Sequence, residues 1–595
     1  MAQSAASLKP AASSAYLGVE RSFLGKKWRL RLTDERLGTA LSQRLGLPEV
    51  VGRVLAARGV SLDAAPQFLN PTLRDLLPDP SRFHDMDAAA SRLARAIAAG
   101  ELIAIFGDYD VDGATSAALL SRFFSAVGGR VTAYIPDRRK EGYGPNIPAL
   151  AQLKEQGASL VITVDCGTLA FEALDAAKDF GLEVIVVDHH EAEVKLPAAL
   201  AVINPNRLDE SGGFGELAAV GVAFLLVVAV NRALRSQGWY EARAEPDMMA
   251  WLDLVALGTI CDVVPLTGLN RAFVTQGLKV LAGRSNLGLS ALCDVARVAS
   301  KPGAYHAGFL LGPRINAGGR VGKSDLGYRL LTCEDPEECR RIAAILDALN
   351  TERRQIESQV LASAEAQTEG DRSPVVVAAG EGWHVGVIGI VASRLKERFG
   401  RPACVIGLEN GLGKGSARSI PGIDLGAAVI AARHKGLLVN GGGHAMAAGF
   451  TIEREKIAPL RDFLAERIGS QGDAQGPSLG LDGALSPDAA TLDLAGDLTR
   501  IGPFGAGNSE PRFAFPNVRL ASAEIVGEHV RCSLAGAGGN LKAMAFRAAH
   551  TALGEGLLRC RGTSLHIAGR IAADEWQGRK SICVFIDDAA AMRTV

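Results

Sequence analysis

The sequence predicts an α/β protein with two α/β lobes joined by a long helix and a small β-barrel at the C-terminal end. Short Val/Ile-rich runs alternate with Ala/Leu/Lys-rich segments between residues 100 and 190, a pattern typical of strand–helix–strand units around a parallel sheet. Residues 335–366 are rich in charge and free of glycine, which predicts one long helix. Short alternating runs at 518–525, 529–534 and 541–546 predict the strands of the barrel.

Length and composition divide the chain into several domains. At 595 residues the chain is too long for one hydrophobic core, and its 48% apolar content supports globular folding. We expect a disordered tail and an N-terminal cap over residues 1–85, followed by a first α/β domain over 86–280. A helical connector over 281–370, a second α/β domain over 371–468, a Gly/Gln/Ser-rich linker and a barrel over 478–595 complete the chain.

Charge, cysteine usage and hydropathy narrow the class of protein. The net charge of −1 means that any surface for a polyanion must be local. The nine cysteines show no CxxC spacing, as in proteins of a reducing cytoplasm. The most apolar run, 217–230, is too short to span a membrane, so we expect a buried helix there and no membrane partner.

The run from Phe106 to Gly113 carries three carboxylates within five residues, at Asp108, Asp110 and Asp112. Like charges at this spacing repel one another unless a cation lies among them, so the run predicts a divalent metal site. The spacing matches the start of an EF-hand calcium loop, which requires a bidentate Glu at its twelfth position. That position holds Leu119, and the preceding residues alternate like a strand, so we exclude the calcium loop.

Acidic residues also follow other apolar elements. Asp165 follows the run 160–164, and Asp188 with its two histidines follows the run 183–187. We group Asp262, in the apolar segment 251–264, with these strand ends, although a helix cap or a salt bridge would also explain it. Parallel sheets place their sites beyond the carboxyl ends of the strands, so these side chains are expected to converge.

The expected ligands are carboxylates and imidazoles, without a cysteine pair. Carboxylates suit Mg²⁺ and Mn²⁺, and imidazole favours Mn²⁺ or another transition metal. Several carboxylates with one or two histidines can hold two ions about 3.5–4 Å apart, an arrangement suited to phosphoryl chemistry. Asp165 lies on a central strand and is best placed to bridge such a pair.

These motifs resemble those of a known family. The segments 107–113, 165–167 and 188–190, with Asp262, resemble the four motifs of the DHH phosphoesterases. The segments 382–394, 416–419 and 441–449 are similar to the DHH-associated domain, and 311–320 and 502–511 are similar to RecJ-like members of the family. The resemblance covers the chain from about residue 40 to its C-terminal end.

The resemblance implies a metal-dependent exonuclease that degrades single-stranded DNA from its 5′ end to 5′-mononucleotides in DNA repair and recombination. It implies two ions of Mn²⁺ or Mg²⁺ and an OB-like fold for the C-terminal barrel. It further implies a monomer that acts with a helicase and a single-strand-binding protein.

The resemblance also assigns roles to individual residues. It implies that Asp110 binds the first ion and Asp165 bridges the two, while His190 orients or protonates a reacting group and Asp108 stays outside the ligand set. Many relatives carry a ligating His where this chain has Phe106, so we expect the first site to be weaker or to fill only with substrate bound. The ligands implied for the second ion are Asp112, His189 and Asp262.

Three groups of residues are candidates for substrate binding. Arg138 and Tyr143 match a loop near the metals in RecJ-like proteins. Arg314 and Arg320 flank Asn316 in a Gly-rich loop, where arginine suits bidentate phosphate contact and a surface salt bridge is the alternative. Glycines 441–443 precede His444 in either a phosphate-binding segment or a tight turn. The residues expected to hold a terminal phosphate are Arg418, Ser419 and His444.

Other interpretations stay open from the sequence. His384 is as compatible with a core position as with substrate contact, and core packing is the simpler role for most barrel aromatics. A DHH-type enzyme for short oligonucleotides or 3′-phosphoadenosine phosphate is a second candidate, and a catalytically silent DNA-binding scaffold is a third. The extra barrel argues against the second candidate, and the complete set of acids argues against the third.

Overall fold

The computed structural model describes residues 14–32, 34–138, 140–469, 476–576 and 579–592, with nothing said of the side chains at 575–579. The predicted N-terminal tail up to residue 13 and most of the predicted linker lie outside the described residues. The chain forms two compact units. The first comprises the described parts of Met1–Asn70, Gln475–Phe504 and Asn508–Val595, and the second comprises those of Pro71–Ala474 and Gly505–Gly507.

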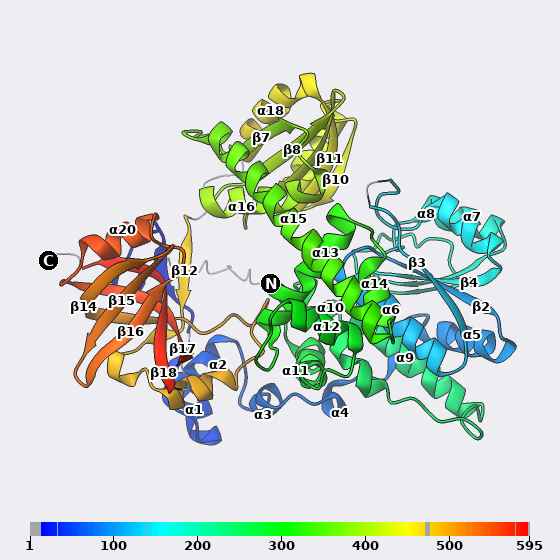
Figure 1. Cartoon of the computed structure of the whole chain (residues 1–595), viewed down its shortest axis with the longest axis horizontal. Coiled ribbons are helices and arrows are strands. Elements are labelled where there is room, and N and C mark those ends of the chain that lie inside the picture. Colours follow the sequence, from blue (N-terminus) through cyan, green and yellow to red (C-terminus); the bar gives the residue numbers. More distant parts are fainter. Residues whose placement is uncertain (1–13, 33, 139, 470–475, 577–578, 593–595) are drawn as a thin grey trace, which may run out of the picture. The chain divides into compact units, whose positions relative to one another are not determined.

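The second unit begins with a five-stranded parallel sheet in the order β3-β2-β4-β5-β6 (Figure 1). Alternate residues of its β-branched strands face opposite layers of helices. Ile103, Ile105 and Ile162 pack with one helical layer, and Ala104 and Val161 pack with the other. The strands are β2 (Leu102–Gly107), β3 (Arg130–Tyr134), β4 (Ala158–Val164), β5 (Glu183–Val187) and β6 (Ala201–Ile203).

Helices cover both faces of this sheet, as expected for strand–helix–strand units. Figure 1 shows α7 and α8 on one side and α5 and α9 on the other. The helices are α4 (Leu73–Leu76), α5 (Met86–Ala99), α6 (Val111–Ala126), α7 (Ile147–Glu155), α8 (Phe171–Asp179) and α9 (Ala219–Ser236). By length and hydropathy alone α9 could cross a membrane, but 72% of its apolar window is buried, so it is a core helix.

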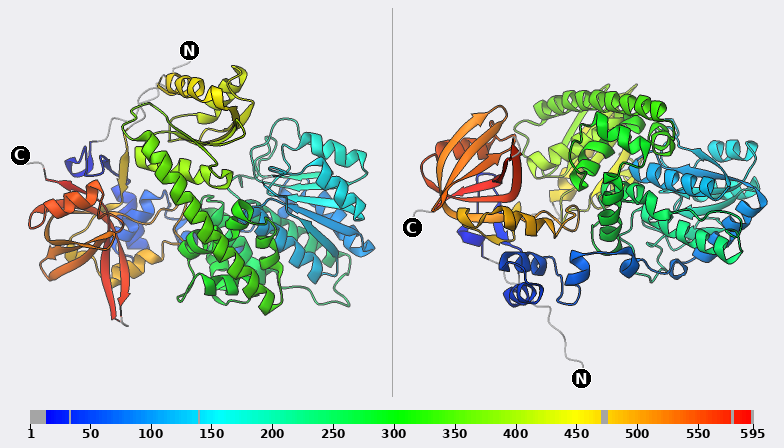
Figure 2. Two further views of the ribbon diagram at one scale, coloured as in Figure 1. Left: turned by 45° about the horizontal axis from the view of Figure 1, so that its top comes forward. Right: turned by 60° about the horizontal axis from the view of Figure 1, so that its bottom comes forward.

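A helical region follows the sheet and ends in the long helix predicted at 335–366. This helix, α15, has 33 residues (Pro336–Thr368), and the Asp335 carboxylate caps its first turn by accepting from the Glu337 N–H. The preceding helices are α10 (Leu252–Cys261), α11 (Gly268–Ala282), α12 (Leu287–Val295), the π-helix η4 (His306–Leu311), α13 (Gly312–Val321) and α14 (Leu326–Thr332). Figures 1 and 2 show α15 running from this region toward the next sheet.

The next sheet has the order β10-β11-β9-β8-β7 and is antiparallel except for the β7–β8 pair. Helix α16 and the C-terminal part of α15 share one core cluster with it, whereas α17 and α18 share another. Its strands are β7 (Val376–Glu381), β8 (Ala403–Glu409), β9 (Leu412–Arg418), β10 (Asn440–His444) and β11 (Ala447–Glu453). Its helices are α16 (Val385–Phe399), α17 (Leu425–His434) and α18 (Ile457–Gly469).

The first unit contains a closed five-stranded barrel, in which β14, β15, β16, β18 and β17 pair in turn and β17 returns to β14. The β16–β18 pair is parallel and the other pairs are antiparallel, as in an OB-fold. The strands are β14 (Phe513–Val526), β15 (His529–Gly536), β16 (Gly539–Ala545), β17 (Ser564–Trp576) and β18 (Arg579–Ala591), with α19 (Leu492–Thr499) and α20 (Ala552–Arg559).

The N-terminal helices belong to the barrel's core, which sequence analysis did not anticipate. Leu41, Val51 and Leu55 of α1 (Glu35–Leu45) and α2 (Glu49–Ala57) share one hydrophobic cluster with the barrel strands. Strand β1 (Lys27–Leu30) pairs with β12 (Ser478–Leu481). The buried Asp482 carboxylate accepts hydrogen bonds from Arg31 and Arg58, which ties the two chain segments together.

Candidate functional site

Asp110 lies where β2 turns into α6. Its Oδ1 accepts the N–H groups of Asp112 and Gly113 at 2.9 and 3.1 Å and so caps the helix, which leaves Oδ2 for another partner. The turn requires glycine at position 113, because a Cβ there would lie 2.5 Å from the Asp108 carbonyl oxygen. The glycine of the motif therefore lets the acidic turn close tightly against its helix.

Asp112 is buried one residue into the same helix. Its two oxygens accept the N–H groups of Ala219 and Val220, at 2.7 and 3.0 Å, at the start of α9. Burial, followed by the charges of Asp262 and Asp110, raises the pKa of Asp112 well above its usual range. The fold thus holds this carboxylate at one position although its charge is costly there.

Asp165 follows β4 in the left-handed backbone region, with a φ of 60°. That conformation is uncommon for a residue with a side chain, although Asp adopts it more readily than most. The Asp165 N–H donates to the Val187 carbonyl, and the Tyr143 hydroxyl donates to the Asp165 carbonyl at 3.0 Å. Burial and then the charges of Asp110 and Asp112 raise the pKa of Asp165 well above its usual range.

Asp188 supports the two histidines that follow it. Its Oδ1 accepts the N–H groups of His189 and His190 and lies 2.7 Å from Nδ1 of His190, while its Oδ2 accepts the Thr168 N–H. Burial alone would raise the pKa of Asp188, but hydrogen bonds from His190 and Thr168 outweigh it and hold the pKa below its usual value. Asp188 therefore orients the histidines.

His189 presents one ring nitrogen to the acids. Its Nδ1 lies 3.1 Å from the Leu217 carbonyl oxygen, and its Nε2 lies 3.3 Å from Asp165 Oδ1 and 3.6 Å from Asp262 Oδ2. Burial and then His190 lower the pKa of His189 to about 4, so the ring is neutral at pH 7. A neutral imidazole held by a carbonyl at Nδ1 is the form that binds a metal through Nε2.

Asp262 ends a helix, which corrects our grouping of this residue with the strand ends. It is the C-cap of α10, and its N–H donates to the Gly258 carbonyl at 2.9 Å. The apolar run before it looked like a strand because α10 is buried nearly all round. Burial and the charge of Asp110, opposed by His190, raise the pKa of Asp262 to about 7.

Three sets of donor atoms come together here, each set lying within 4.8 Å. Asp165 and His189 each belong to two sets, which fits the expected bridging position of Asp165. Nε2 of His189 and Oδ1 of Asp108 are buried without a hydrogen-bond partner among the described residues, as expected of atoms that face a cation. The sets are Asp112–His189–Asp262, Asp108–Asp110–Asp165 and Asp165–His189–His190.

Asp108 and Phe106 were both expected to lie outside the ligand set, and the structure treats them differently. Asp108 was expected outside the ligands, yet its carboxylate groups with Asp110 and Asp165. Phe106 is buried and stacks on Tyr134 at 5.5 Å, in the core cluster on the far side of the sheet. The first donor set therefore consists of three carboxylates, to which Phe106 contributes nothing.

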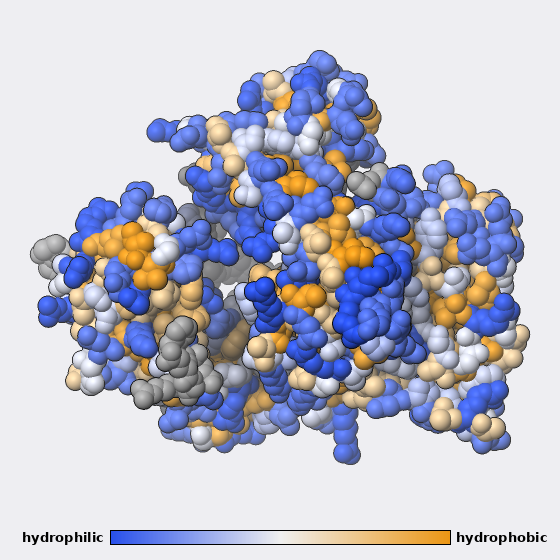
Figure 3. Space-filling view, in the orientation of Figure 1, coloured by the Kyte–Doolittle hydropathy of each residue, from blue (hydrophilic) through white to orange (hydrophobic). Residues whose placement is uncertain are grey.

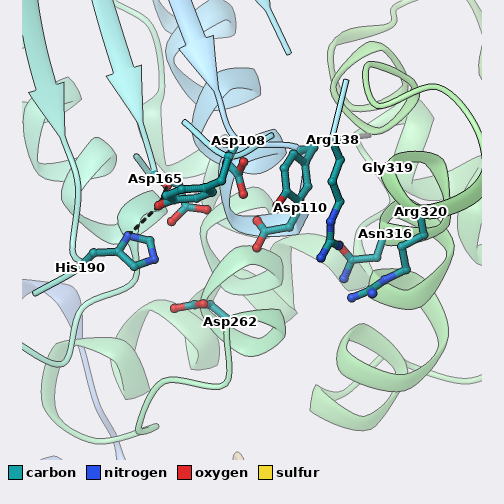
Figure 4. A pocket seen from close by; sticks show the side chains of 11 residues that line it. Asp108, Asp110, Arg138, Asp165, His190, Asp262, Asn316, Gly319 and Arg320 are labelled. Atoms are coloured by element: carbon teal, nitrogen blue, oxygen red, sulfur yellow. Dashed lines mark hydrogen bonds between the residues drawn. The ribbon is translucent and has the colours of Figure 1, made fainter. Parts of the chain in front are cut away.

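The acids form one side of a cavity of about 270 Å³ that carries two arginines. Figure 4 shows the carboxylates of Asp108, Asp110, Asp165 and Asp262 converging from the turns that follow the strands and from α10, with Arg138 and Arg320 across from His190. The Arg138 guanidinium lies over the Tyr109 ring, 5.0 Å from its centre. The lining residues that sequence analysis named are Asp110, Arg138, Tyr143, Asp165, His190, Asp262, Asn316 and Arg320.

The segment carrying Asn316 is the helix α13 rather than the predicted loop. Asn316 and Arg320, four residues apart, lie on one helix face and line the cavity. Arg314 lies on another face, where it pairs with Asp347 at 2.9 Å and donates to the Leu310 carbonyl. The predicted phosphate contact of Arg314 is thus replaced by the salt bridge that was its alternative.

A second cavity of about 250 Å³ shares Arg320 with the first. Arg418 of β9 also lines it and donates to Ser416 Oγ and to the Ala417 carbonyl. Burial and then Arg138 lower the pKa of Arg418, so the cation is partly removed from water and suited to an anion. Sequence analysis missed Ser393 and Arg394, which line this cavity from α16.

The three remaining predicted positions have different environments. Ser419 is fully buried, and its hydroxyl donates to the Ile423 carbonyl at 2.7 Å, so it offers nothing to a ligand as placed. His444 ends β10 with its side chain 62% exposed. His384 is the N-cap of α16 and accepts the Gly386 N–H, a role that neither proposed alternative included.

Among the described side chains of the barrel, Phe546 lies in an exposed aromatic cluster. Phe513 and Phe515 lie in the core as expected, but Phe546 is 54% exposed and packs edge-on against His529 and Phe585. Figure 3 shows apolar side chains gathered on the barrel next to α20. Lys542 is an exposed residue of β16, and Phe546 directly follows the end of that strand.

Comparisons with known proteins agree with this geometry. The DHH family N-terminal domain matches residues 102–259, the DHHA1 domain matches 372–470, and the RecJ OB domain matches 481–588. The single-stranded-DNA-specific exonuclease RecJ of Dickeya dadantii is 38% identical over 560 residues, which cover 91% of this chain and 96% of that protein.

Two solved structures are similar over most of the chain. RecJ of Thermus thermophilus in complex with Mn²⁺ has a TM-score of 0.80 and 29% identity, covering 94% of this chain and 79% of that one. Its complex with Mg²⁺ has a TM-score of 0.75 and 27% identity, covering 95% and 78%. The donor sets and the closed barrel are consistent with these similarities in sequence and fold. The chain therefore belongs to the RecJ family of single-stranded-DNA-specific exonucleases.

Proposed function

We propose that this protein is a metal-dependent exonuclease that degrades single-stranded DNA from its 5′ end to 5′-mononucleotides in DNA repair and recombination. The observation that carries the proposal is the set of carboxylate and imidazole donors on one side of a cavity whose other side holds Arg138 and Arg320. Oxygen donors bind divalent cations and arginines bind phosphates, so the cavity suits a phosphodiester next to metal ions.

The residues present fit Mn²⁺ or Mg²⁺, which carboxylate oxygens and a neutral imidazole bind well. Asp112, His189 and Asp262 would hold one ion, Asp108 and Asp110 another, and Asp165 would serve both. Such a pair of ions supplies a water molecule of lowered pKa and charge stabilisation for an in-line displacement at phosphorus.

The chain's own residues position the strand. Arg138 and Arg320 would bind phosphate oxygens in the first cavity, and Arg418 would bind the terminal phosphate in the second. Tyr143 is 54% exposed at the rim and would stack on a base. A proposed strand path through both cavities would exclude duplex DNA.

His190 would hold or donate a proton at Nε2. Burial lowers the pKa of His190, but its hydrogen bond to Asp188 outweighs this and raises the pKa above its usual value. Its ring lines the cavity with Nδ1 turned toward Asp188, so Nε2 is the atom free to meet a phosphate or a leaving oxygen.

The barrel and the partners complete the proposal. The Phe546 cluster on the barrel would stack a base of the strand, in keeping with the use of aromatic rings by OB-folds. We infer that the protein acts as a monomer in the cytoplasm, where its nine free cysteines stay reduced, with a helicase and a single-strand-binding protein supplying the strand.

One assay tests the proposal. A long single strand labelled at the 5′ or the 3′ end is incubated with Mn²⁺ or Mg²⁺, and the Asp165→Ala variant serves as the control. We expect the wild-type protein to release labelled mononucleotide first from the 5′ end. We expect the Asp165→Ala variant to release none. Degradation of dinucleotides alone would instead support a short-oligonucleotide enzyme, and binding without degradation would support a silent scaffold.

A further inference from the structure

Glu191 contacts the second α/β domain beside the first cavity. Its Oε2 lies 3.3 Å from Nδ1 of His444 on the second sheet. Glu191 directly follows His190, which lines the cavity, and on the other side of the cavity Arg320 donates to the Gly386 carbonyl at 2.9 Å. Figure 4 places His190 and Arg320 at opposite sides. The cavity therefore lies between two contacts of the second α/β domain, one with the first α/β domain and one with the helical connector.

The backbone that leads to Glu191 is fixed. The carbonyl oxygens of His189 and His190 accept the side-chain amides of Asn206 and Asn204 at 2.5 and 2.8 Å. The N–H groups of the same two histidines donate to Asp188. The Glu191 side chain thus starts from a defined position at the cavity rim.

The backbone at His444 is fixed as well. His444 pairs with Ala447 across the β10–β11 ladder, and the Leu425 N–H donates to the Ala445 carbonyl at 3.1 Å. A Cβ at Gly426 would lie 2.7 Å from the His444 carbonyl oxygen, so α17 packs directly against this turn. The contact between Glu191 and His444 can therefore form or break through side-chain rotation alone.

A carboxylate oxygen and a phosphate oxygen compete for the same imidazole N–H. The side chains of His444 and Glu191 are 62% and 81% exposed, so water and solutes reach the pair and its exchange is easy. Resting on the proposed function and on the expectation from the sequence that His444 holds a terminal phosphate, we propose that Glu191 is a gate: it occupies His444 in the DNA-free protein, and a phosphate of the strand displaces it.

The gate is expected to change the affinity for the DNA strand and not the rate of the chemical step. Glu191 belongs to none of the three donor sets and does not line either cavity. Exposed ion pairs are weak, so removal of the competing carboxylate is expected to tighten strand binding by about two- to fivefold. KM should fall by the same factor while kcat stays unchanged.

The experiment compares Glu191→Gln with Glu193→Gln. Glu193 is an exposed acid on the same loop that forms no ion pair among the described residues, so it controls for the loss of one negative charge. KM and kcat are measured with Mn²⁺ on a 5′-phosphorylated single strand, and Kd is measured by fluorescence anisotropy in the Asp165→Ala background. Each glutamate variant is also combined with His444→Gln.

We expect KM and Kd to fall in Glu191→Gln by more than they change in Glu193→Gln. We expect this difference to vanish in the His444→Gln background. Equal effects of the two glutamate variants, or an effect that persists without His444, would overturn the gate while the nuclease proposal stands. A wild-type protein that neither binds nor degrades the strand would refute the proposed function itself, and the gate with it.

Discussion

Asp253 is a buried acid without a role in the proposed chemistry, and replacing it with Asn should stabilise the protein above pH 6. Its side chain lies in the first turn of α10, 1% exposed, where Oδ1 accepts the Leu254 N–H. Burial, opposed by that hydrogen bond and by Arg122, raises its pKa from 3.8 to about 6. Asn keeps an acceptor oxygen for the same N–H and removes the charge.

The magnitude follows from the two pKa values. Between pH 4 and 6 the unfolded chain loses this proton while the folded chain keeps it, so stability falls as pH rises and then levels off. At about 1.4 kcal/mol per tenfold change in proton affinity, the carboxylate costs up to about 3 kcal/mol at pH 8. With about 2.1 cal/mol/K of unfolding entropy per residue, a unit of roughly 400 residues gains about 3–4 °C in Tm.

Thermal unfolding of Asp253→Asn and wild type at pH 4 and pH 8 measures this effect. The control is Asp247→Asn, which alters an exposed acid that also accepts a backbone N–H, from Met249. Asp253→Asn should melt higher at pH 8 and close to wild type at pH 4, with nuclease activity unchanged. An equal or lower Tm at pH 8 would refute the reasoning, because it would mean that the charged carboxylate is well solvated in the fold.

Three further predictions follow from the site and the barrel. Asp165→Ala should lower strand degradation at least 100-fold while anisotropy still detects single-strand binding, because Asp165 belongs to two of the donor sets. Adding Mn²⁺ at 100 times its Kd to chelator-treated protein should raise the unfolding free energy by about 2.7 kcal/mol. The same Mn²⁺ concentration should raise the unfolding free energy of Asp262→Asn by less, which calorimetry measures. Phe546→Ala should weaken single-strand binding by about 1–3 kcal/mol, whereas Ile525→Ala, which removes another exposed apolar side chain of the barrel, should leave it unchanged.

Local pattern made much of the first domain predictable. The Val/Ile runs before Asp165 and Asp188 are strands β4 and β5, and the charged segment 335–366 lies within α15. Parallel strands bring their carboxyl ends to one edge, so the sequence already placed Asp110, Asp165 and the histidines together. The sets of donor atoms within 4.8 Å agree with that placement.

Helical register and burial were harder to read from sequence. The segment 312–321 looked like a loop because of its glycines, but those glycines let α13 pack closely, as at Gly319, where a Cβ would lie 3.0 Å from the Tyr109 carbonyl oxygen. Helical geometry turns the two arginines of this segment to different faces. Arg320 therefore faces the cavity, whereas Arg314 pairs with Asp347. Asp262 likewise looked like a strand end, because the run before it is mostly apolar, but that run forms the buried helix α10.

The sequence by itself determined the donor types, the strand ends that carry them and the order of the domains, because these depend on local composition and period. Tertiary structure decided which atoms meet: the Asp108 carboxylate lies with those of Asp110 and Asp165, Ser419 turns inward, and the N-terminal helices share the barrel's core. Those outcomes depend on contacts between residues far apart in the chain, and no local pattern of side chains encodes which distant surface will cover them.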